Sequence, residues 1–354
     1  MAIKKSEPVT PSVKGLSSMR IALISPFSNP PMRGNITTVR RIAHFLGNAG
    51  AVTLNLPADT LSVGEMECHL SEFKPDLVHG FHAYHCGAIT RELAERCQIP
   101  YIITITGSDI HNPIQRNHPG TARAIEAAQV VVSFNRSDAA MLSEYFPNLR
   151  GKISVVPQGI EPLPFVESHA FGLNHDEFIL LLPTAVRSVK RVEFPLQSLS
   201  QMVQHDPTLR LVIAGGIIEQ EYATYIRSLL CDTPFATWLG EVPYEQMGSL
   251  YRRADLVLNC SRSESMPNSI MEAMALGRPV LAINIPGNRS LVKHGENGWL
   301  YNGEEDFMEL VPQIRANAAL REEMGARAIT FMAENFSPVS EAERYLSLYT
   351  NTRS

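Results

Sequence analysis

The chain has 354 residues, of which 44% are hydrophobic and 19% charged, and its formal net charge is −5. This composition predicts a soluble globular protein of two domains, and the acidic balance argues against nucleic acid as a partner. No apolar run reaches the ~20 residues that a membrane span needs, so no transmembrane segment is expected. Residues 1–165 carry a net charge of +2 and the remainder −7, which favours at most a weak association of the first half with an anionic acceptor or membrane surface.

The first 18 residues lack an apolar core of signal-peptide length. We read residues 1–18 as a disordered leader, or as an artefact of start-site choice, and expect the fold to begin at Met19. The five cysteines form no Cys-x-x-Cys pair. Buried reduced thiols in a cytoplasmic protein are therefore expected.

Short apolar runs alternate with amphipathic segments of helix length, which is the pattern of doubly wound α/β units. In the first half we expect strands at 20–25, 52–56, 76–80, 101–105, 129–133 and 153–156. In the second half we expect strands at 178–183, 210–214, 236–239, 255–260, 279–284 and 299–301. Expected helices between them include 36–48, 87–97, 136–145, 191–205, 244–253, 268–276 and 304–316.

Two strand sets of similar size predict two Rossmann-like domains, at residues 19–165 and 166–337. The break falls at residues 159–165, which contain two prolines and show no periodicity. A last helix is expected at residues 338–350. No low-complexity tract or internal repeat interrupts this organisation.

Two carboxylates bracket the loop and helix that follow the apolar run at residues 255–260. Glu264 lies in the loop, Pro267 and Asn268 open the next helix, and Glu272 lies in its first turns. A carboxylate near a helix start can simply complement the helix dipole. Two of them at the carboxyl end of a strand instead favour a ligand rich in hydroxyls, because each ionised carboxylate accepts hydrogen bonds from sugar or ribose.

Residues 261–280 resemble the signature of the retaining nucleotide-sugar glycosyltransferases of family 4, which have the GT-B fold of two Rossmann-like domains facing across a cleft. The resemblance covers nearly all of residues 19–350. It implies that Glu264 faces the donor sugar, that Glu272 binds the ribose, and that the last helix crosses back to the first domain. It also places the intervening Ser265, Met266, Pro267 and Asn268 on the donor side.

Ser265 departs from the family pattern, which usually has Gly at this position. Because Gly lets the backbone approach a ligand closely, a side chain here is expected to crowd the donor sugar. This departure bears on the identity of the donor more than on the fold.

Arg187 and Lys190 follow the first strand of the second half and precede a helix. This position is the carboxyl edge of the sheet, facing the cleft between the domains. Arg and Lys can neutralise a leaving diphosphate without a metal ion. A solvated basic turn is the alternative. The spacing is shorter than is usual in the family and resembles one subgroup of it, so either Lys190 or Arg191 can be the second phosphate ligand.

Two segments of the first half are further candidates. Gly34 and Asn35 stand between the first strand and first helix, where close backbone approach and a helix start suit an anion, although a plain turn fits as well. Gly107, Ser108 and Asp109 follow the fourth strand and are expected to line the sugar or acceptor side. Asp109 can instead cap the next segment.

Three histidines, His79, His82 and His85, are spaced three residues apart. This spacing fits a zinc site in part, but no cysteine partners stand nearby and a closed site needs four ligands, so we expect no metal. The resemblance implies that His82 or His85 faces the acceptor cleft. A packing role within the core is expected of the remaining histidines.

These features predict a retaining glycosyltransferase that moves a sugar from a nucleoside-diphosphate sugar, such as a UDP-sugar, to an unidentified acceptor. The resemblance implies that neither a metal nor another cofactor is required. One alternative is another GT-B enzyme, such as a seleno- or thiosugar synthase or a sugar-nucleotide epimerase. The other is a nucleotide-sugar-binding protein without turnover.

Overall fold

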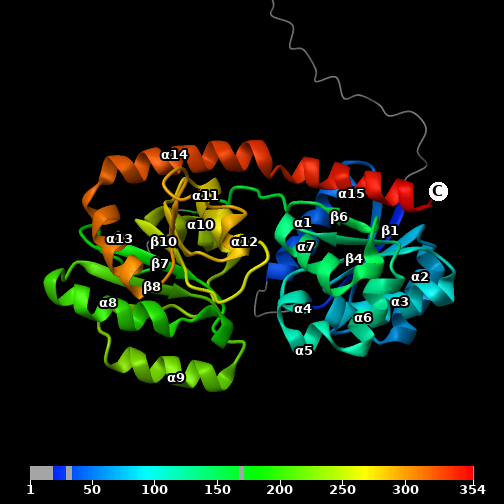
Figure 1. Ribbon diagram of the computed structural model, residues 1–354, viewed down its shortest axis with the longest axis horizontal. Coiled ribbons are helices and arrows are strands. Elements are labelled where there is room, and N and C mark those ends of the chain that lie inside the picture. Colours follow the sequence, from blue (N-terminus) through cyan, green and yellow to red (C-terminus); the bar gives the residue numbers. More distant parts are fainter. Residues whose placement is uncertain (1–18, 29–33, 167–170, 354) are drawn as a thin grey trace, which may run out of the picture.

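The computed structural model describes residues 19–28, 34–166 and 171–353 (Figure 1). The expected leader at residues 1–18 lies outside the described residues. Two six-stranded sheets, one in each half of the chain, form separate bodies side by side. In the described part of the chain, no helix combines the length and the apolar character required to cross a membrane.

The N-terminal half, residues 19–165, contains a parallel sheet in the order β2-β1-β3-β4-β5-β6. Its strands are β1 (Arg20–Ser25), β2 (Val52–Pro57), β3 (Leu77–Phe81), β4 (Tyr101–Thr104), β5 (Val130–Ser133) and β6 (Ile153–Val155). Its helices are α1 (Gly34–Asn48), α2 (Val63–Phe73), α3 (Ala83–Cys97), α4 (Ser108–His111), α5 (Pro113–Arg116), α6 (Pro119–Ala127) and α7 (Arg136–Tyr145), with a 3₁₀ turn η1 (Pro147–Leu149).

The C-terminal half contains a second parallel sheet in the order β12-β11-β10-β7-β8-β9. Its strands are β7 (Phe178–Pro183), β8 (Leu209–Ala214), β9 (Ala236–Trp238), β10 (Leu256–Asn259), β11 (Val280–Ile283) and β12 (Trp299–Tyr301). Its helices are α8 (Glu193–His205), α9 (Gln220–Cys231), α10 (Tyr244–Arg253), α11 (Asn268–Ala275), α12 (Pro286–Arg289), α13 (Glu304–Ala316) and α14 (Ala318–Asn335), with a 3₁₀ turn η2 (Ser188–Lys190).

The predicted α/β fold is confirmed, and each of the twelve predicted strands lies within one residue of an observed strand. β7 and β10 are buried at every position, as expected of parallel strands that helices cover on both faces. The expected helix at 87–97 begins earlier, at Ala83. His82 caps it by accepting a hydrogen bond from the His85 amide at 3.3 Å. Histidine is not among the residues that are favoured at helix N-caps, so the sequence did not predict this start.

A long helical segment connects the two halves along one side of the molecule, drawn in orange and red in Figure 1. α14 packs in the core of the C-terminal half, and α15 (Pro338–Arg353) packs against α1 in the N-terminal half. Arg41 on α1 contacts Glu341 on α15 through two hydrogen bonds of 3.1 and 3.2 Å, both side chains being buried. This ion pair fixes the end of the chain to the N-terminal half.

The expectation of buried thiols is only partly correct. Cys86 and Cys260 are buried, whereas Cys68 and Cys231 are exposed, and all five cysteines are free. Cys68 lies on α2 and Cys231 is the last residue of α9, so both are placed on helices that cover the outside of a sheet.

Candidate functional site

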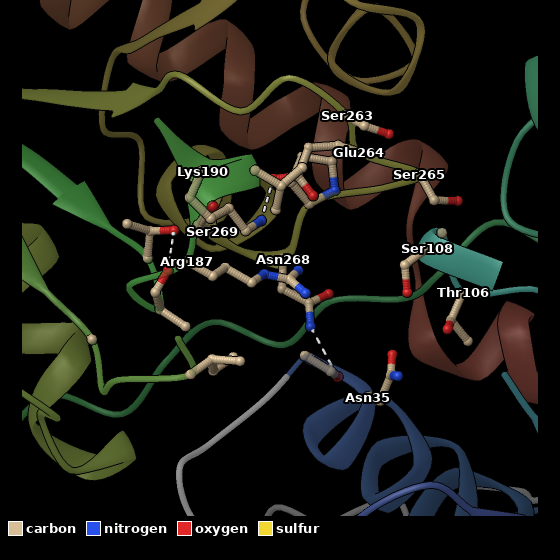
Figure 2. Close-up of a pocket in the computed structure, with 18 of the residues that line it drawn as sticks. Asn35, Thr106, Ser108, Arg187, Lys190, Ser263, Glu264, Ser265, Asn268 and Ser269 are labelled. Carbon is tan, nitrogen blue, oxygen red and sulfur yellow. Dashed lines mark hydrogen bonds and ion pairs between the residues drawn. The ribbon is translucent and has the colours of Figure 1, made fainter. Parts of the chain in front are cut away.

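A cavity of about 1120 Å³ lies between the two halves. The loops that follow β7, β8 and β10 line it from the C-terminal half, and the start of α1 and the segment after β4 line it from the N-terminal half. Carboxyl ends of parallel strands are the usual ligand-binding edge of such sheets. Figure 2 shows labelled residues of both halves around this space.

Arg187 lines the cavity at the end of the segment that follows β7. Its backbone is extended, and it directly precedes the 3₁₀ turn that carries Lys190. The Arg187 Nε atom is buried and has no hydrogen-bond partner among the described residues. A guanidinium that is held at a cavity without an acceptor is well suited to bind an anion.

Lys190 and Glu264 form an ion pair inside the cavity, with Lys190 Nζ donating to Glu264 Oε1. Asn259 Nδ2 at the end of β10 lies 3.4 Å from the same carboxylate oxygen. Burial acts to raise the pKa of Glu264, but the adjacent Lys190 ammonium outweighs it and holds that pKa below its ordinary value. Glu264 is therefore an ionised carboxylate, available to accept hydrogen bonds from hydroxyl groups.

Arg191 does not line the cavity. Its backbone is left-handed, with φ of 51°, and its guanidinium carbon lies 4.7 Å from the ring centroid of Phe194. The two neighbouring cations are thus separated, because Lys190 faces the cavity and Arg191 packs on an aromatic ring.

Glu272 lines the cavity from α11. The hydroxyl of Tyr251, a buried residue of α10, donates to Glu272 Oε2 at 2.8 Å. Burial raises the pKa of Glu272 to about 7, although this hydrogen bond acts in the opposite direction. The sequence analysis did not single out Tyr251, because its contact with Glu272 spans two elements and no local pattern predicts it.

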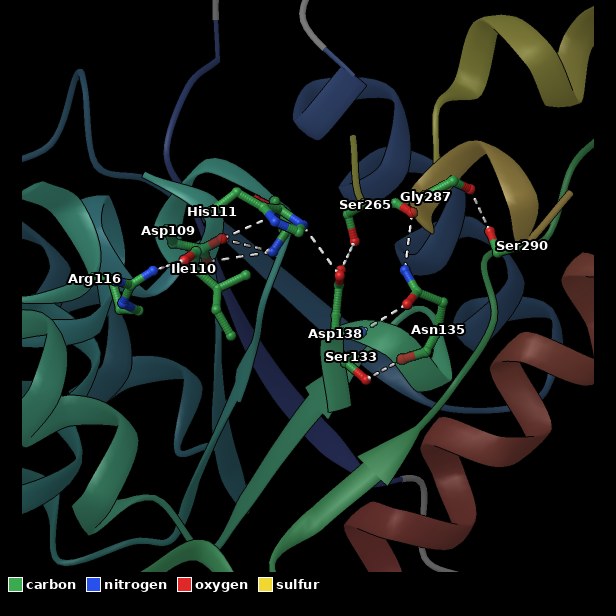
Figure 3. Close-up of polar contacts among 12 residues, drawn as sticks. Asp109, Ile110, His111, Arg116, Ser133, Asn135, Asp138, Ser265, Gly287 and Ser290 are labelled. Atoms are coloured by element: carbon green, nitrogen blue, oxygen red, sulfur yellow. Dashed lines mark hydrogen bonds and ion pairs between the residues drawn. The ribbon is translucent and has the colours of Figure 1, made fainter. Parts of the chain in front are cut away.

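Ser265 lies beside Glu264, and its contacts give a different role from the expected crowding of a donor. Its hydroxyl donates to Asp138 Oδ2 on α7 of the N-terminal half. Its carbonyl accepts from Asn135 Nδ2 at 2.8 Å (Figure 3). Gly107 approaches from the same half with φ of 129°, and a Cβ there would lie 3.4 Å from Ser265 Cβ. The Ser265 hydroxyl is thus used in a contact between the halves.

The residues after Ser265 also contact the N-terminal half. The Met266 carbonyl accepts from Gln158 Nε2 at 3.0 Å, and Asn268 Nδ2 lies 3.4 Å from the Gly34 carbonyl. A Cβ on Gly34 would lie 3.3 Å from that Asn268 nitrogen, so the start of α1 comes close to this segment. Gly34 and Asn268 both line the cavity, as do two further predicted residues beside them, Asn35 and Pro267.

The predicted acceptor-side residues divide into two groups. His82, His85, Gly107 and Ser108 line the cavity, and His82 Nε2 lies 2.9 Å from Ser108 Oγ. Burial lowers the pKa of His82, despite the nearby Asp109 carboxylate. The His82 ring is therefore neutral, and it can either donate or accept a hydrogen bond.

Asp109 is buried and does not line the cavity. Its carboxylate accepts hydrogen bonds from the amides of Ala83 at 2.9 Å, Thr106 at 3.1 Å and Gly107 at 2.8 Å. The expected role on the sugar or acceptor side is therefore not supported. Asp109 instead holds the loop after β4 and the start of α3 together.

The histidine series does not converge on one point. His79 is buried in β3, with its ring nitrogens 2.7 Å from Tyr349 Oη and from Thr104 Oγ1. Burial lowers the pKa of His79 to about 3. Among the described residues, no group of three or more His, Cys, Asp or Glu side chains is arranged to hold a metal ion.

The sequence analysis did not single out several polar residues that line the cavity from the N-terminal half, among them Thr38, His111 and Gln158. His111 is the last residue of α4, and its Nε2 lies 3.1 Å from Asp138 Oδ1. In the sequence, Asn135 is a favoured N-cap residue and so marks the start of α7. In the structure its side-chain oxygen accepts from the Asp138 amide at 2.8 Å and caps that helix.

Known proteins share this fold and this sequence pattern. Solved structures that match include Anabaena HepE in complex with UDP-glucose, with a TM-score of 0.79, 15% identity and coverage of 94% of this chain and 100% of HepE. Sucrose-phosphate synthase from Thermosynechococcus elongatus matches with a TM-score of 0.80, 18% identity and coverage of 94% and 98%. The fold is therefore GT-B.

Sequence relatives are also glycosyltransferases by name. Glycosyltransferase 1 domain-containing protein 1 from Xenopus tropicalis is 26% identical over 329 residues, which are 90% of this chain and 94% of that protein. D-inositol 3-phosphate glycosyltransferase from Nocardia farcinica is 27% identical over 301 residues, 78% of this chain and 66% of that protein. The chain is a glycosyltransferase, and its residues 166–331 match the model of the family described as Glycosyl transferases group 1.

Proposed function

We propose that this glycosyltransferase takes its sugar from a UDP-sugar and transfers it, with retention of configuration, to an acceptor held by the N-terminal half. The observation that carries the proposal is the arrangement of charges in the cavity. No described residue accepts a hydrogen bond from the buried Nε of Arg187, which shares the cavity with the Lys190–Glu264 pair and with Glu272. The similar fold of HepE, which was solved with UDP-glucose, supports the choice of donor.

Arg187 and Lys190 would bind the diphosphate and stabilise the negative charge that develops on it as the bond to the sugar breaks. Lys190 donates one hydrogen bond to Glu264, and an ammonium has three donors, so two remain for phosphate oxygens. We propose that these two cations do the work for which other transferases use a metal ion. Transfer by this chain would then require no divalent cation.

Glu272 and Glu264 would bind different parts of the donor. Glu272 would accept hydrogen bonds from the ribose, which is present in both donor and product. Glu264 would accept hydrogen bonds from the transferred sugar, where its ionised carboxylate can act more strongly in the transition state than in the ground state. No side chain in the cavity is proposed as a covalent nucleophile, so the acceptor hydroxyl would attack the sugar directly. The donor diphosphate would take up the proton of that hydroxyl.

A thermal-shift panel tests the donor. UDP, GDP and ADP, and one sugar derivative of each, are compared on the wild-type chain and on the Arg187→Ala variant. A ligand at 100 times its dissociation constant adds about 2.7 kcal/mol to the free energy of unfolding. We expect UDP and its sugar derivative to stabilise the wild type, with EDTA present, and to have a much smaller effect on the variant. No shift with any nucleotide would contradict the proposal.

Transfer to water tests the stereochemistry without knowledge of the acceptor. UDP-glucose carries an α-linked sugar, so retention releases α-glucose and inversion releases β-glucose. Proton NMR distinguishes the two anomers if the spectrum is recorded before they equilibrate. Release of the β-anomer would contradict the retaining mechanism and leave the choice of donor intact.

A further inference from the structure

Ser265 is held by the N-terminal half at two separate atoms, although it belongs to the C-terminal half. Its hydroxyl donates to Asp138 Oδ2, and its carbonyl accepts from Asn135 Nδ2 at 2.8 Å (Figure 3). All three residues are buried. Two hydrogen bonds in a site shielded from water fix both the side chain and the backbone of Ser265. We call Asn135, Asp138, His111 and Ser265 the clasp.

Asp138 is itself held firmly on the N-terminal side. Its amide donates to Asn135 Oδ1 at 2.8 Å, and its Oδ1 lies 3.1 Å from His111 Nε2. Burial acts to lower the pKa of His111, but the Asp138, Asp109 and Glu264 carboxylates outweigh it and raise that pKa. The His111 ring thus faces Asp138 Oδ1, which leaves Oδ2 to accept from Ser265.

The clasp borders the carboxylate that would face the donor sugar. Ser265 is joined by a peptide bond to Glu264, whose side chain pairs with Lys190 inside the cavity. Gly287 packs against the same backbone, where a Cβ would lie 2.1 Å from the Glu264 carbonyl oxygen. The backbone of Glu264 and Ser265 therefore packs closely against Gly287 and is also bonded to α7 and its cap, so a change at the clasp is passed to Glu264.

We propose that Asp138 is a positioning residue of the N-terminal half, which acts through the Ser265 hydroxyl to hold Glu264 in its place on the donor. The inference rests on the proposed function, because it takes Glu264 to contact the donor sugar. It assigns the positioning of Glu264 to a residue outside the donor-binding half. Glu272 and Arg187 do not contact the clasp, so nucleotide binding does not depend on it. Loss of the clasp should lower turnover and leave affinity for UDP in place.

The test compares Ser265→Ala, Asp138→Ala and the double variant. Release of UDP from UDP-glucose in water gives kcat and KM, and calorimetry gives the affinity for UDP. A hydrogen bond to a charged group that acts only in the transition state predicts a fall in kcat of about tenfold for either single variant. We expect UDP affinity to change less than about threefold, and the double variant to be no slower than Asp138→Ala, because both changes remove one interaction.

Matched controls come from the same helix. Ser143→Ala removes an exposed hydroxyl of α7 that bonds to the Ala139 carbonyl, and Glu144→Ala removes an exposed carboxylate one residue further on. Both should retain wild-type kcat. If Asp138→Ala does not fold, Ser265→Ala decides the question by its kcat and UDP affinity alone.

The outcomes separate the inference from the proposed function. A wild-type chain that neither binds UDP nor releases it from UDP-glucose overturns the proposed function, and the inference with it. An active wild type with an equally active Ser265→Ala variant overturns the inference alone. Parallel losses of kcat and UDP affinity, or effects of the two single changes that multiply in the double variant, also overturn it.

Discussion

The two halves of the molecule bring different chemistry to one cavity. The C-terminal half contributes seven charged side chains: Arg187, Lys190, Glu219, Glu241, Arg262, Glu264 and Glu272. The described residues of the N-terminal half contribute hydroxyls, amides and imidazoles, including those of Asn35, Thr38, His82, Ser108 and His111. A charged surface suits a ligand of fixed charge, whereas a surface of neutral donors and acceptors suits hydroxyl groups. The difference supports a division of labour between donor and acceptor.

This contrast also explains how the two sites are built. In the C-terminal half, Arg187, Lys190 and Glu264 lie in the segments that follow β7 and β10, and Glu272 lies in the next helix, α11. In the N-terminal half, polar groups from α1, α3 and α4 meet only when the sheet is complete. The first site is carried by local sequence, and the second by tertiary packing. Substitutions made in one half at a time test this contrast.

The largest effect on donor binding is expected from Arg187→Ala. The variant loses a charge-assisted contact worth about 1.5–3 kcal/mol, so kcat/KM should fall roughly 10- to 150-fold. UDP affinity, measured by calorimetry, should fall with it, because the contact is made to the diphosphate. Arg191→Ala is the matched control, since the Arg191 guanidinium packs on Phe194 outside the cavity. Wild-type UDP affinity in Arg187→Ala would contradict the assigned role.

The sequence located cavity-lining residues in both halves, but not the contacts that join the two halves. Strand positions were predictable because each apolar run is bounded by residues that end strands. Glu264 and Glu272 were predictable because a single loop and helix carry both, with seven residues between them. His111 and Asp138 were not, because their contact joins α4 to α7, and the contact of Asp138 with Ser265 spans 127 residues.

Asp109 shows why a short motif left two roles open, one on the sugar or acceptor side and one as a cap. Its position after a strand at the sheet edge is the same as that of a ligand-binding carboxylate. Its side chain instead turns inward to three backbone amides, so that it is buried and away from the cavity. The sequence places a residue at the edge of a sheet, but the nearby backbone amides that need a hydrogen-bond acceptor determine where its side chain points.

A second pair of changes separates the two carboxylates within the C-terminal half. Glu264→Gln should lower turnover about tenfold and keep UDP affinity, because Glu264 would touch the transferred sugar and its loss frees Lys190 for phosphate. Glu272→Gln should weaken UDP and UDP-glucose alike. Calorimetry with UDP and release of UDP from UDP-glucose measure the two quantities. Loss of UDP binding in Glu264→Gln alone would reverse the two roles.

A pH dependence of donor binding is expected from Glu272, whose pKa burial raises to about 7. Ribose hydroxyls bind the ionised carboxylate, so UDP affinity should rise with pH and be about tenfold higher at roughly pH 8 than at roughly pH 6. Calorimetry in two buffers of different ionisation enthalpy should also detect a proton released on binding. Glu272→Gln should remove this dependence, and Glu245→Gln, an exposed change on α10, should keep it.

Glu272 affects the stability of the unliganded chain in the opposite direction, since this stability should fall as the pH rises. The folded pKa of Glu272 lies above the ordinary value of 4.5, so the folded state binds more protons than the unfolded state between these values. Its contribution to the free energy of unfolding is fully present below about pH 4.5 and is lost as the pH rises through about 7. Urea unfolding of wild type and Glu272→Gln over this range should show the difference. Identical pH profiles would contradict the buried, protonated state of Glu272.

The smallest effect on the donor is expected from Ser108→Ala in the N-terminal half. Ser108 lines the cavity, and its hydroxyl lies 2.9 Å from His82 Nε2. The change removes one neutral hydrogen bond, and no charged donor-binding residue contacts this hydroxyl. UDP affinity should therefore remain within about threefold of wild type, which corresponds to less than about 1 kcal/mol.

Transfer of the sugar to an acceptor, once one is found by screening sugar and polyol hydroxyls, should fall more in Ser108→Ala than release of UDP with water as acceptor. A loss of UDP affinity as large as that of Arg187→Ala would show that the N-terminal half also binds the donor, and the division between the two halves would then be wrong.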